Sequence, residues 1–188
     1  MQGLLRRKML YQISDRLPMR YIDHDGSYME RFYVTTIGKV RVYLHRFVGS
    51  DPDGLHSHPF PYSFSIILVG WYFEDRPMQR RIRRFFNFIG PNDLHRVVLP
   101  NNGKDVWTLF FHTPRSQPWG TLRPVDGEVL DADVPGVLAT KEYAYVVHSE
   151  PEDPAFSTWY KTAPKGRELR KTRPQIPLGL SAAGAGMK

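Results

Sequence analysis

The chain of 188 residues contains no cysteine, which excludes disulfide bonds, thiolate zinc sites and cysteine nucleophiles. Long apolar runs are also missing, and none approaches the roughly 18 residues that a membrane-spanning helix needs. Near the N-terminus, Arg6, Arg7 and Lys8 interrupt the segment that would form the core of a signal peptide. The phosphate-loop, dinucleotide and serine-nucleophile motifs are absent. We therefore expect a cytoplasmic protein with no membrane partner and no nucleotide cofactor.

Residues that favour turns are abundant, with 16 prolines and 15 glycines. They favour many short strands over long helices. Hydrophobic residues make up 41% of the chain, enough for one domain, which we place at residues 1–160 with a barrel core at about 28–120. A loose helical stripe before Pro18 predicts one short N-terminal helix. The segment 161–188 is basic and ends in glycine and alanine, which predicts a partly disordered, irregular C-terminal extension.

The clearest strand lies at 63–69, where apolar residues are bounded by prolines and by Gly70. Successive side chains of a strand point to opposite faces. Alternation therefore places Ser63, Ser65 and Ile67 on one face of this strand and Phe64, Ile66 and Leu68 on the other. Several further short strands separated by turns complete a pattern that is typical of an all-β protein.

Two histidines, His56 and His58, stand one residue apart, and His95 follows later in the chain. In an extended segment, residues i and i+2 project side by side from the same face. His95 precedes the strand-like run 96–99 and follows a predicted tight turn at 90–93, so it can join them from a neighbouring strand. First-row metal ions are bound by imidazoles arranged in this way. The spacing predicts one metal site made by His56, His58 and His95.

The stretch around these histidines resembles the cupins, a family of small β-barrel proteins. Their first motif is G-x5-H-x-H-x3,4-E-x6-G, and this chain matches its two histidines and its last glycine, Gly70. Their second motif is G-x5-P-x-G-x2-H-x3-N, and the run Gly90–His95 is a degenerate match with Asn92 at a glycine position. The resemblance covers roughly residues 40–120. It implies a jelly-roll barrel, also called a double-stranded β-helix, with the metal inside.

The chain departs from the first motif because Tyr62 and Ser63 stand where the glutamate ligand is expected. A site of three neutral imidazoles keeps the full charge of a divalent ion and favours an anionic substrate. Among cupins, this three-histidine site resembles that of the thiol dioxygenases, which bind Fe(II). The resemblance implies Fe(II), with Zn, Ni or Mn as alternatives. Asp93 is a second candidate ligand, although its place in a turn favours a turn-forming role.

Three further residues are candidates for catalytic contacts with a substrate: Tyr62, His112 and Arg84. Tyr62 follows the histidine pair, and His112 ends the predicted strand 106–112, where binding residues gather in barrels. His112 also has a second interpretation, as a hydrogen-bonded structural histidine.

Arg84 belongs to a strand with four arginines in five residues, the others being Arg80, Arg81 and Arg83. Alternation would turn one pair inward, where guanidinium groups bind carboxylates in a fork, and we expect that pair near His95. The competing interpretation is an edge strand that carries charge against aggregation.

Three functions remain open from the sequence. The leading hypothesis is a metal-dependent oxidoreductase, an Fe(II) dioxygenase acting on a small anionic molecule. The second is a non-catalytic cupin that binds or senses a ligand, because one fold hosts many functions. The third is a nucleic-acid-associated protein, since the net charge is +7 and both the arginine strand and the tail are basic. A homodimer is a further expectation.

Overall fold

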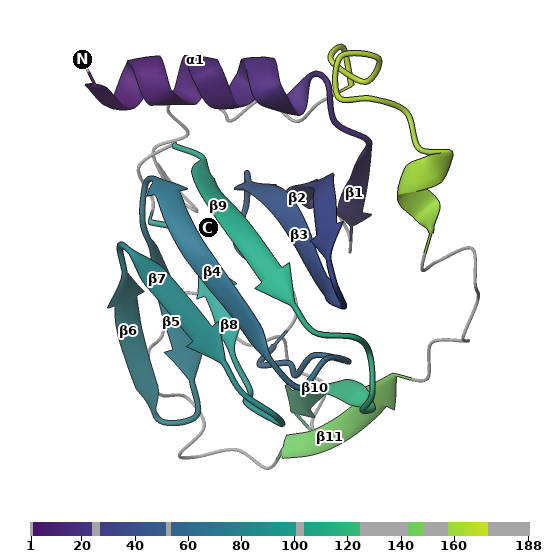
Figure 1. Cartoon of the computed structure of the whole chain (residues 1–188). Helices are drawn as coiled ribbons and strands as arrows, with labels where there is room; N and C mark the ends of the chain where they lie inside the picture. Colours follow the sequence, from purple (N-terminus) through teal and green to yellow (C-terminus); the bar gives the residue numbers. More distant parts are fainter. Residues whose placement is uncertain are drawn as a thin grey trace, which may run out of the picture.

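The computed structural model describes residues 2–23, 27–51, 54–100, 104–124, 143–148 and 158–172 (Figure 1). Its elements follow one another as α1 (Gln2–Ser14), β1 (Met19–Asp23), β2 (Ser27–Ile37), β3 (Val40–Phe47), β4 (Ser63–Val69), β5 (Tyr72–Arg76), β6 (Gln79–Arg83), β7 (Phe86–Ile89), β8 (Arg96–Val98), β9 (Val106–His112), β10 (Trp119–Pro124), β11 (Tyr143–His148) and the 3-10 helix η2 (Trp159–Lys161). The predictions of an all-β protein and of one short N-terminal helix are confirmed. Neither described helix is long and apolar enough to cross a membrane.

Every pair of neighbouring strands is antiparallel, and the strands form three sheets. The largest has the order β1-β2-β3-β9-β4-β7, the second β6-β5-β8, and the third consists of β10 and β11. The two larger sheets share one apolar cluster, and the third lies at their lower end in Figure 1. This is the two-sheet arrangement expected of a jelly roll.

The alternation predicted for β4 is present. Ser63, Ser65 and Ile67 are buried, whereas Phe64 and Ile66 on the other face are exposed. Gly70, directly after β4, has a φ angle of +85°, which residues with side chains rarely adopt. The glycine of the first motif is therefore required by the backbone turn that ends this strand.

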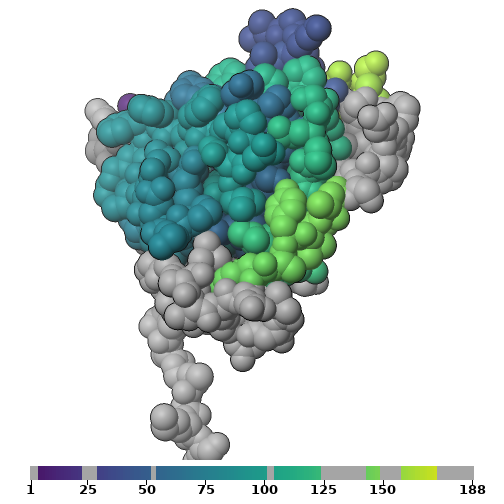
Figure 2. Space-filling view, turned by 90° about the horizontal axis from the view of Figure 1, so that it is seen from below, coloured from purple at the N-terminus to yellow at the C-terminus, as the bar shows by residue number. Residues whose placement is uncertain are grey.

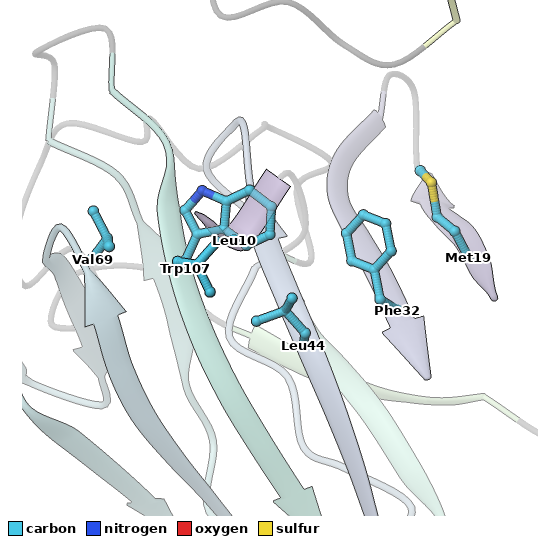
Figure 3. Close-up of a cluster of buried hydrophobic side chains, with 6 residues drawn as sticks. All are labelled: Leu10, Met19, Phe32, Leu44, Val69 and Trp107. Carbon is cyan, nitrogen blue, oxygen red and sulfur yellow. The ribbon is translucent and has the colours of Figure 1, made fainter. Parts of the chain in front are cut away.

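Helix α1 packs across one end of the six-stranded sheet (Figure 1). The side chains of this cluster come from the helix and from five strands of the sheet (Figure 3). They are Leu10, Met19, Phe32, Leu44, Val69 and Trp107. Full burial of such a side chain stabilises the fold by about 1.5–3 kcal/mol.

Buried charges reinforce the contact between α1 and the sheet. Asp105 accepts hydrogen bonds from Nε of Arg46 at 2.9 Å and from the Tyr11 hydroxyl at 3.0 Å, and it also pairs with Arg7. Arg46 reaches Glu30 as well, at 3.0 Å. Helix and sheet thus share one ion-pair network, in which each buried charge has a partner of opposite sign.

The interior between the two larger sheets is layered. An apolar layer at one end consists of Met29, Phe47, Ile67, Tyr72, Val97 and Val106. On each of these segments, a polar residue stands two positions before or after the apolar one and therefore points to the same side. Together with Asn87, the cross-strand partner of Ser65, these residues form what we call the interior polar belt: Arg31, His45, Ser65, Glu74, Asn87, His95 and Thr108. An aromatic layer of Tyr43, Phe60 and Phe110 lies beyond the belt.

Part of the predicted tail is docked rather than free. The Pro164 carbonyl accepts a hydrogen bond from the N–H of Met19 at 2.9 Å, and the N–H of Gly166 donates to Leu17 at 3.0 Å. A Cβ atom on Gly166 would lie 2.4 Å from the Ser14 carbonyl oxygen, so the two segments touch closely. Packing thus continues past residue 160 at least to 172, and residues 173–188 lie outside the described part of the chain.

Candidate metal centre

The segment with the first two histidines is held from both sides by backbone hydrogen bonds. On one side, His56 and His95 form an antiparallel bridge in which each N–H donates to the other's carbonyl at 3.0 Å. On the other side, the N–H of Ser57 donates to the carbonyl of Gly120 in β10 at 2.9 Å. The segment is therefore a short strand, and its pairing fixes the direction of His56 and His58.

The sheet of β10 and β11 supports this segment, and β11 lies in light green against the teal strands in Figure 2. The Ser57 hydroxyl is 2.6 Å from the Tyr145 hydroxyl and accepts a hydrogen bond from the N–H of Gly120 at 3.1 Å. A Cβ atom on Gly120 would lie only 2.3 Å from the carbonyl oxygen of Val146. The close approach of β10 and β11 therefore requires glycine at this position.

A tight turn brings His95 to the site, as predicted. Asn92 has a φ angle of +61°, so asparagine supplies the left-handed conformation for which the second motif uses glycine. The Asp93 carboxylate accepts a hydrogen bond from the N–H of Gly90 at 2.9 Å and pairs with Arg76 at 3.0 Å. Asp93 thus has the turn-forming role and is not one of the residues that converge with His95.

The structure brings the three predicted ligands together. One ring nitrogen from each of His56, His58 and His95 lies within 4.8 Å of the other two. The Nε2 atoms of His58 and His95 are 2.8 Å apart. Two nitrogens at adjacent corners of an octahedral ion with bonds near 2.1 Å would be about 3.0 Å apart. The spacing of His58 and His95 therefore fits a first-row divalent ion as it stands, and His56 lies close enough to complete the donor set.

Carboxylates lie behind two of the imidazoles. Nδ1 of His95 is 3.4 Å from Oε1 of Glu74, and Nδ1 of His56 is 3.3 Å from Oδ2 of Asp51. Both contacts are at ion-pair distance but lack ideal hydrogen-bond geometry. A carboxylate near Nδ1 favours the imidazole tautomer that carries its proton on Nδ1. Nε2 is then free to bind a metal. Sequence reasoning missed both carboxylates.

Glu74 is fully buried and is the centre of a polar cluster. It accepts hydrogen bonds from Arg83 at 2.6 Å, from Asn87 at 2.7 Å and from Arg76 at 3.2 Å. Burial alone would raise the pKa of Glu74, but His95, Arg76 and Asn87 together hold it below its usual range. Glu74 is therefore ionised, and its charge is offset by the two arginines.

The imidazoles of His58 and His95 are neutral near pH 7. Burial lowers the pKa of His95 to about 4, although Glu74 opposes the shift. Burial and the neighbouring histidines likewise lower the pKa of His58 well below its usual value. Neutral imidazole is the form that binds a metal, so no proton has to be displaced.

Ser63 occupies the glutamate position of the first motif, and its buried Oγ atom has no hydrogen-bond partner among the described residues. Oδ1 of Asn87 and Oγ1 of Thr108 are in the same situation. A buried polar group without a partner costs about 1–3 kcal/mol. Within the described ranges, no carboxylate belongs to the group of converging ligands.

His112 lies close to the histidine group, although it is not part of it. Phe60 stacks on His58 with ring centroids 4.9 Å apart and on His112 at 4.2 Å. Nδ1 of His112 is 2.6 Å from the carbonyl oxygen of Thr113, which identifies Nδ1 as the protonated nitrogen. Burial lowers the pKa of His112 to about 4. Nε2 is therefore an unprotonated acceptor.

The other two predicted catalytic residues lie on outer surfaces. Tyr62 is 49% exposed and stacks on Phe88, itself exposed on β7. Arg84 lies 5.2 Å from the ring centroid of Trp71, which contacts Phe73 on the face of β5 opposite Glu74. The structure therefore does not bring Arg84 to the metal centre, because the chain turns outward after β6.

The remaining arginines of this strand are paired within the fold. Arg80 binds Asp75 through two hydrogen bonds of 2.6 and 2.9 Å, and Arg83 binds Glu74. Nε of Arg81 donates to the side chain of Gln79 at 2.9 Å. One arginine, Arg83, does face inward near His95, but it contacts Glu74 there. The prediction that an inward pair of arginines binds the substrate is therefore wrong, because the carboxylates of Asp75 and Glu74 on β5 already bind Arg80 and Arg83.

His45 is buried and accepts a hydrogen bond from Nε of Arg31 at 3.1 Å. Sequence reasoning missed that an ionisable residue can stand on the core face of a strand. Glu74 is a second example, and it directly follows the apolar run 71–73. Such residues are kept inside only with partners.

No protein-family model and no curated protein matches this chain. The solved structures that resemble it include Fe(II)-HppE with the alternative substrate (S)-1-HPP, at 10% identity and a TM-score of 0.45, covering 53% of this chain and 57% of that one. The DMSP lyases RdDddP and RnDddQII match at 14% identity and a TM-score of 0.44, covering 52% and 57%. A cupin-2 domain protein from Shewanella frigidimarina matches at 10% and 0.40, covering 50% and 85%.

This chain thus spans little more than half the length of the first two proteins. The third is described as a cupin, the family that the two histidine motifs resemble. At these identities and TM-scores, nothing about function is carried over from them. The chemistry of the site rests on the residues of this chain.

Proposed function

We propose that this protein is a metal-dependent enzyme in which His56, His58 and His95 bind a divalent first-row ion, Fe(II) foremost, next to a small anionic substrate. The observation that supports this most is the convergence of three ring nitrogens within 4.8 Å, which no carboxylate of the described residues joins. Such a donor set suits iron, zinc, nickel or manganese, and the choice among them depends on geometry and supply. When bound, Fe(II) would supply redox chemistry with O₂, which makes a dioxygenase the leading reaction class.

The chain's own residues prepare the site for an ion. The carboxylates of Glu74 and Asp51, 3.4 and 3.3 Å from Nδ1 of His95 and His56, favour the tautomer that leaves Nε2 of each ring free for the ion. Phe60 packs flat on His58 and limits rotation of that ring. Pairing of the histidine segment with His95 and with β10 fixes the backbone beneath. A site supported in this way needs little reorganisation when the ion binds.

Charge at the site favours an anion. Three neutral imidazoles add no charge to a dication, the carboxylate of Glu74 is offset by Arg76 and Arg83, and Asp51 adds one negative charge behind His56. A substrate carboxylate would therefore still meet net positive charge in a largely buried environment, where Coulomb attraction is strong. His112 supports proton transfer, because its Nε2 atom is a neutral acceptor one aromatic ring away from His58.

Metal content is the first test. Protein purified without a histidine tag and loaded anaerobically with Fe(II) should hold near one ion per chain. His58→Ala should abolish uptake, whereas the control His148→Gln, at a histidine of β11 outside the group, keeps a side chain that can bond Thr121 and should retain it. Circular dichroism would establish that both variants are folded. Equal metal content in His58→Ala and in the parent would contradict the proposed site.

Oxygen consumption separates an enzyme from a binding protein. The Fe(II)-loaded parent is mixed with a panel of small carboxylates in an oxygen-electrode cell. Uptake of O₂ that requires both iron and one of these acids supports the dioxygenase. Metal and ligand binding without O₂ uptake or any turnover favours the non-catalytic alternative. Association with DNA or RNA is less favoured, because carboxylates already pair Arg80 and Arg83.

A further inference from the structure

The outer surface of β4 and β7 carries a group of large apolar side chains that are open to solvent. On β4 or directly before it, Tyr62 is 49% exposed, Phe64 37% and Ile66 38%, and on β7 Phe86 is 60% and Phe88 52% exposed. Single exposed apolar residues are common on proteins, whereas a contiguous group of them marks a site of interaction. We call these five residues the aromatic face.

Strand register makes the aromatic face contiguous. Phe64 is the cross-strand partner of Phe88, and Ile66 is the partner of Phe86. The rings also meet along the diagonals, since Tyr62 stacks on Phe88 and Phe64 stacks on Phe86, each pair with ring centroids 6.2 Å apart. The residues between them on both strands are buried in the barrel, so all five project from the same side of the sheet.

Neighbouring elements leave this surface open. On one side it continues onto β9, where the partly buried Phe111 and Leu109 are the cross-strand partners of Phe64 and Ile66. Helix α1 lies on the same side of the sheet but further along, where its Tyr11 packs on Trp107 of β9 at 5.2 Å. On the other side β7 is the last strand of the six-stranded sheet as described (Figure 1). An edge strand with exposed apolar side chains favours association between chains.

The area of the aromatic face is sufficient for a specific interface. At about 200 Å² for a fully exposed side chain of this size, the five exposed fractions amount to roughly 500 Å². The largest apolar patch of a typical monomer covers about 300–600 Å² and is often functional. Two such faces packed together bury roughly 1,000 Å², the lower limit for a biological interface, before a polar rim is added.

The chemistry of the face selects its partner. None of its five residues is charged, so it offers nothing to a nucleic acid or to an acidic peptide. With a net charge of +7, two copies of this chain repel each other unless the surface between them is uncharged. A second aromatic face matches the first in polarity and size. Sheets also pack face to face with nearly aligned strands, an arrangement that allows both faces to interdigitate about a two-fold axis.

We propose that the aromatic face is the interface of a two-fold symmetric homodimer, in which the outer surfaces of β4 and β7 of two copies pack against each other. Phe64 is its central residue, because it contacts Phe86 on one side and Phe111, at 6.3 Å, on the other. The inference is independent of the proposed function, since no residue of the metal centre belongs to the face.

Sedimentation velocity of the full chain over a concentration series tests the proposal. The parent should sediment as a dimer that dissociates on dilution. Phe86→Lys and Phe88→Lys should each raise the dissociation constant of the dimer about 100-fold or more, because a buried aromatic anchor is worth at least tenfold and each change occurs twice in a symmetric interface. Phe88→Tyr keeps the ring and should keep the dimer.

A matched control separates the face from exposed apolar residues in general. Ile82 is 53% exposed on β6, which belongs to the other sheet, so Ile82→Lys should leave the dissociation constant unchanged. Circular dichroism establishes that each variant is folded. Should a lysine variant fail to fold, Phe86→Thr and Phe88→Thr retain a residue that favours strands and should show the same weakening of the dimer.

The absence of cysteine permits a second measurement. A single introduced cysteine can form a disulfide only between two chains, and residues near a two-fold axis lie next to their own copies. Single cysteines are placed in turn at each position of the face. At least one should form a cross-linked dimer faster than Ile82→Cys under mild oxidation. Cross-linking of Ile82→Cys at a rate equal to the fastest of them would contradict the proposal.

Three results would overturn the proposed dimer. One is a parent that stays monomeric at every concentration and binds a hydrophobic dye, which would assign the face to another kind of molecule. Another is a monomeric parent that binds the dye only after Leu178→Asp and Leu180→Asp, which would assign the face to the C-terminal segment of the same chain. The third is a dimer that both lysine variants leave intact. None of them affects the metal centre, which metal content tests separately.

Discussion

Nδ1 of His95 and Oε1 of Glu74 are 3.4 Å apart, and both residues are buried. Glu74→Gln keeps the shape of the side chain but removes the charge that orients this imidazole. We expect the dissociation constant for Zn(II) to rise about 10- to 100-fold, as for other carboxylates behind metal-binding histidines. Competition with a chromophoric chelator measures it. Asp75→Asn changes a carboxylate on the opposite face of β5 and should leave the metal affinity unchanged; equal losses in both variants would deny Glu74 a special role.

Acid should destabilise the metal-free protein well above the range in which carboxylates titrate. Burial lowers the pKa of His112 to about 4 in the folded state, whereas an unfolded histidine titrates near 6.5. As pH falls, the unfolded state therefore takes up the proton first. The contribution of His112 is complete above pH 6.5 and is lost as pH falls toward 4, by about 3 kcal/mol.

Urea unfolding of metal-free protein at pH 7.5, 6.5 and 5.5 measures this dependence. His45, whose pKa is also lowered by burial, should add to the slope. Glu74 contributes little in this window, because an unfolded glutamate titrates lower, near 4.3. His112→Asn should have a shallower slope than the parent. A free energy of unfolding that stays constant from pH 7.5 to 5.5 would show that these imidazoles are not buried in their neutral form.

The attachment of α1 depends on Asp105. Asp105→Ala would leave Arg46 buried with one of its two carboxylate partners missing, and would remove the acceptor for Tyr11. Breaking a buried ion pair costs about 3–5 kcal/mol. Chemical denaturation, followed by fluorescence of the adjacent Trp107, measures the loss. Asp15→Ala removes the partner of Arg170, which is exposed, and should cost about 1 kcal/mol or less. A similar cost for both would contradict the network.

Gly120 should tolerate no side chain. A Cβ atom there would overlap the carbonyl oxygen of Val146, so Gly120→Ala should separate β10 from β11 and weaken the support of the histidine segment. We expect lower stability and weaker metal binding together. Gly38→Ala is the matched control, because its φ of +59° makes alanine strained by about 1–2 kcal/mol, yet nothing lies within 4 Å. It should lower stability without changing metal affinity.

Local patterns were sufficient to predict a large part of the fold. Alternation in β4 gave its two faces, and Gly70 and Asn92 mark backbone turns that their residue types allow. The spacing of His56 and His58 places both on one short strand. These signals lie within a few residues of the feature that they predict, so no knowledge of strand pairing is needed.

The partners of buried charges were not predictable, because they depend on which strands pair. Arg80 and Arg83 look free along the chain, but the hairpin of β5 and β6 brings them to Asp75 and Glu74. His45 has its partner, Arg31, on the preceding strand in a register that the sequence does not reveal. Which charged side chains meet is decided by strand pairing and register, and these are set by tertiary packing.

The insertion of β9 between β3 and β4 constrains the order in which the molecule assembles. β3 can complete its pairing only when β9 is present, and Arg41 pairs with His112, far along the chain. During synthesis, His56 and His58 therefore emerge long before the strands that confine them, and their partner segment around Gly120 comes still later. Contacts so distant in sequence fold slowly. Ion capture is thus expected to be one of the last events of biogenesis, after the barrel has closed.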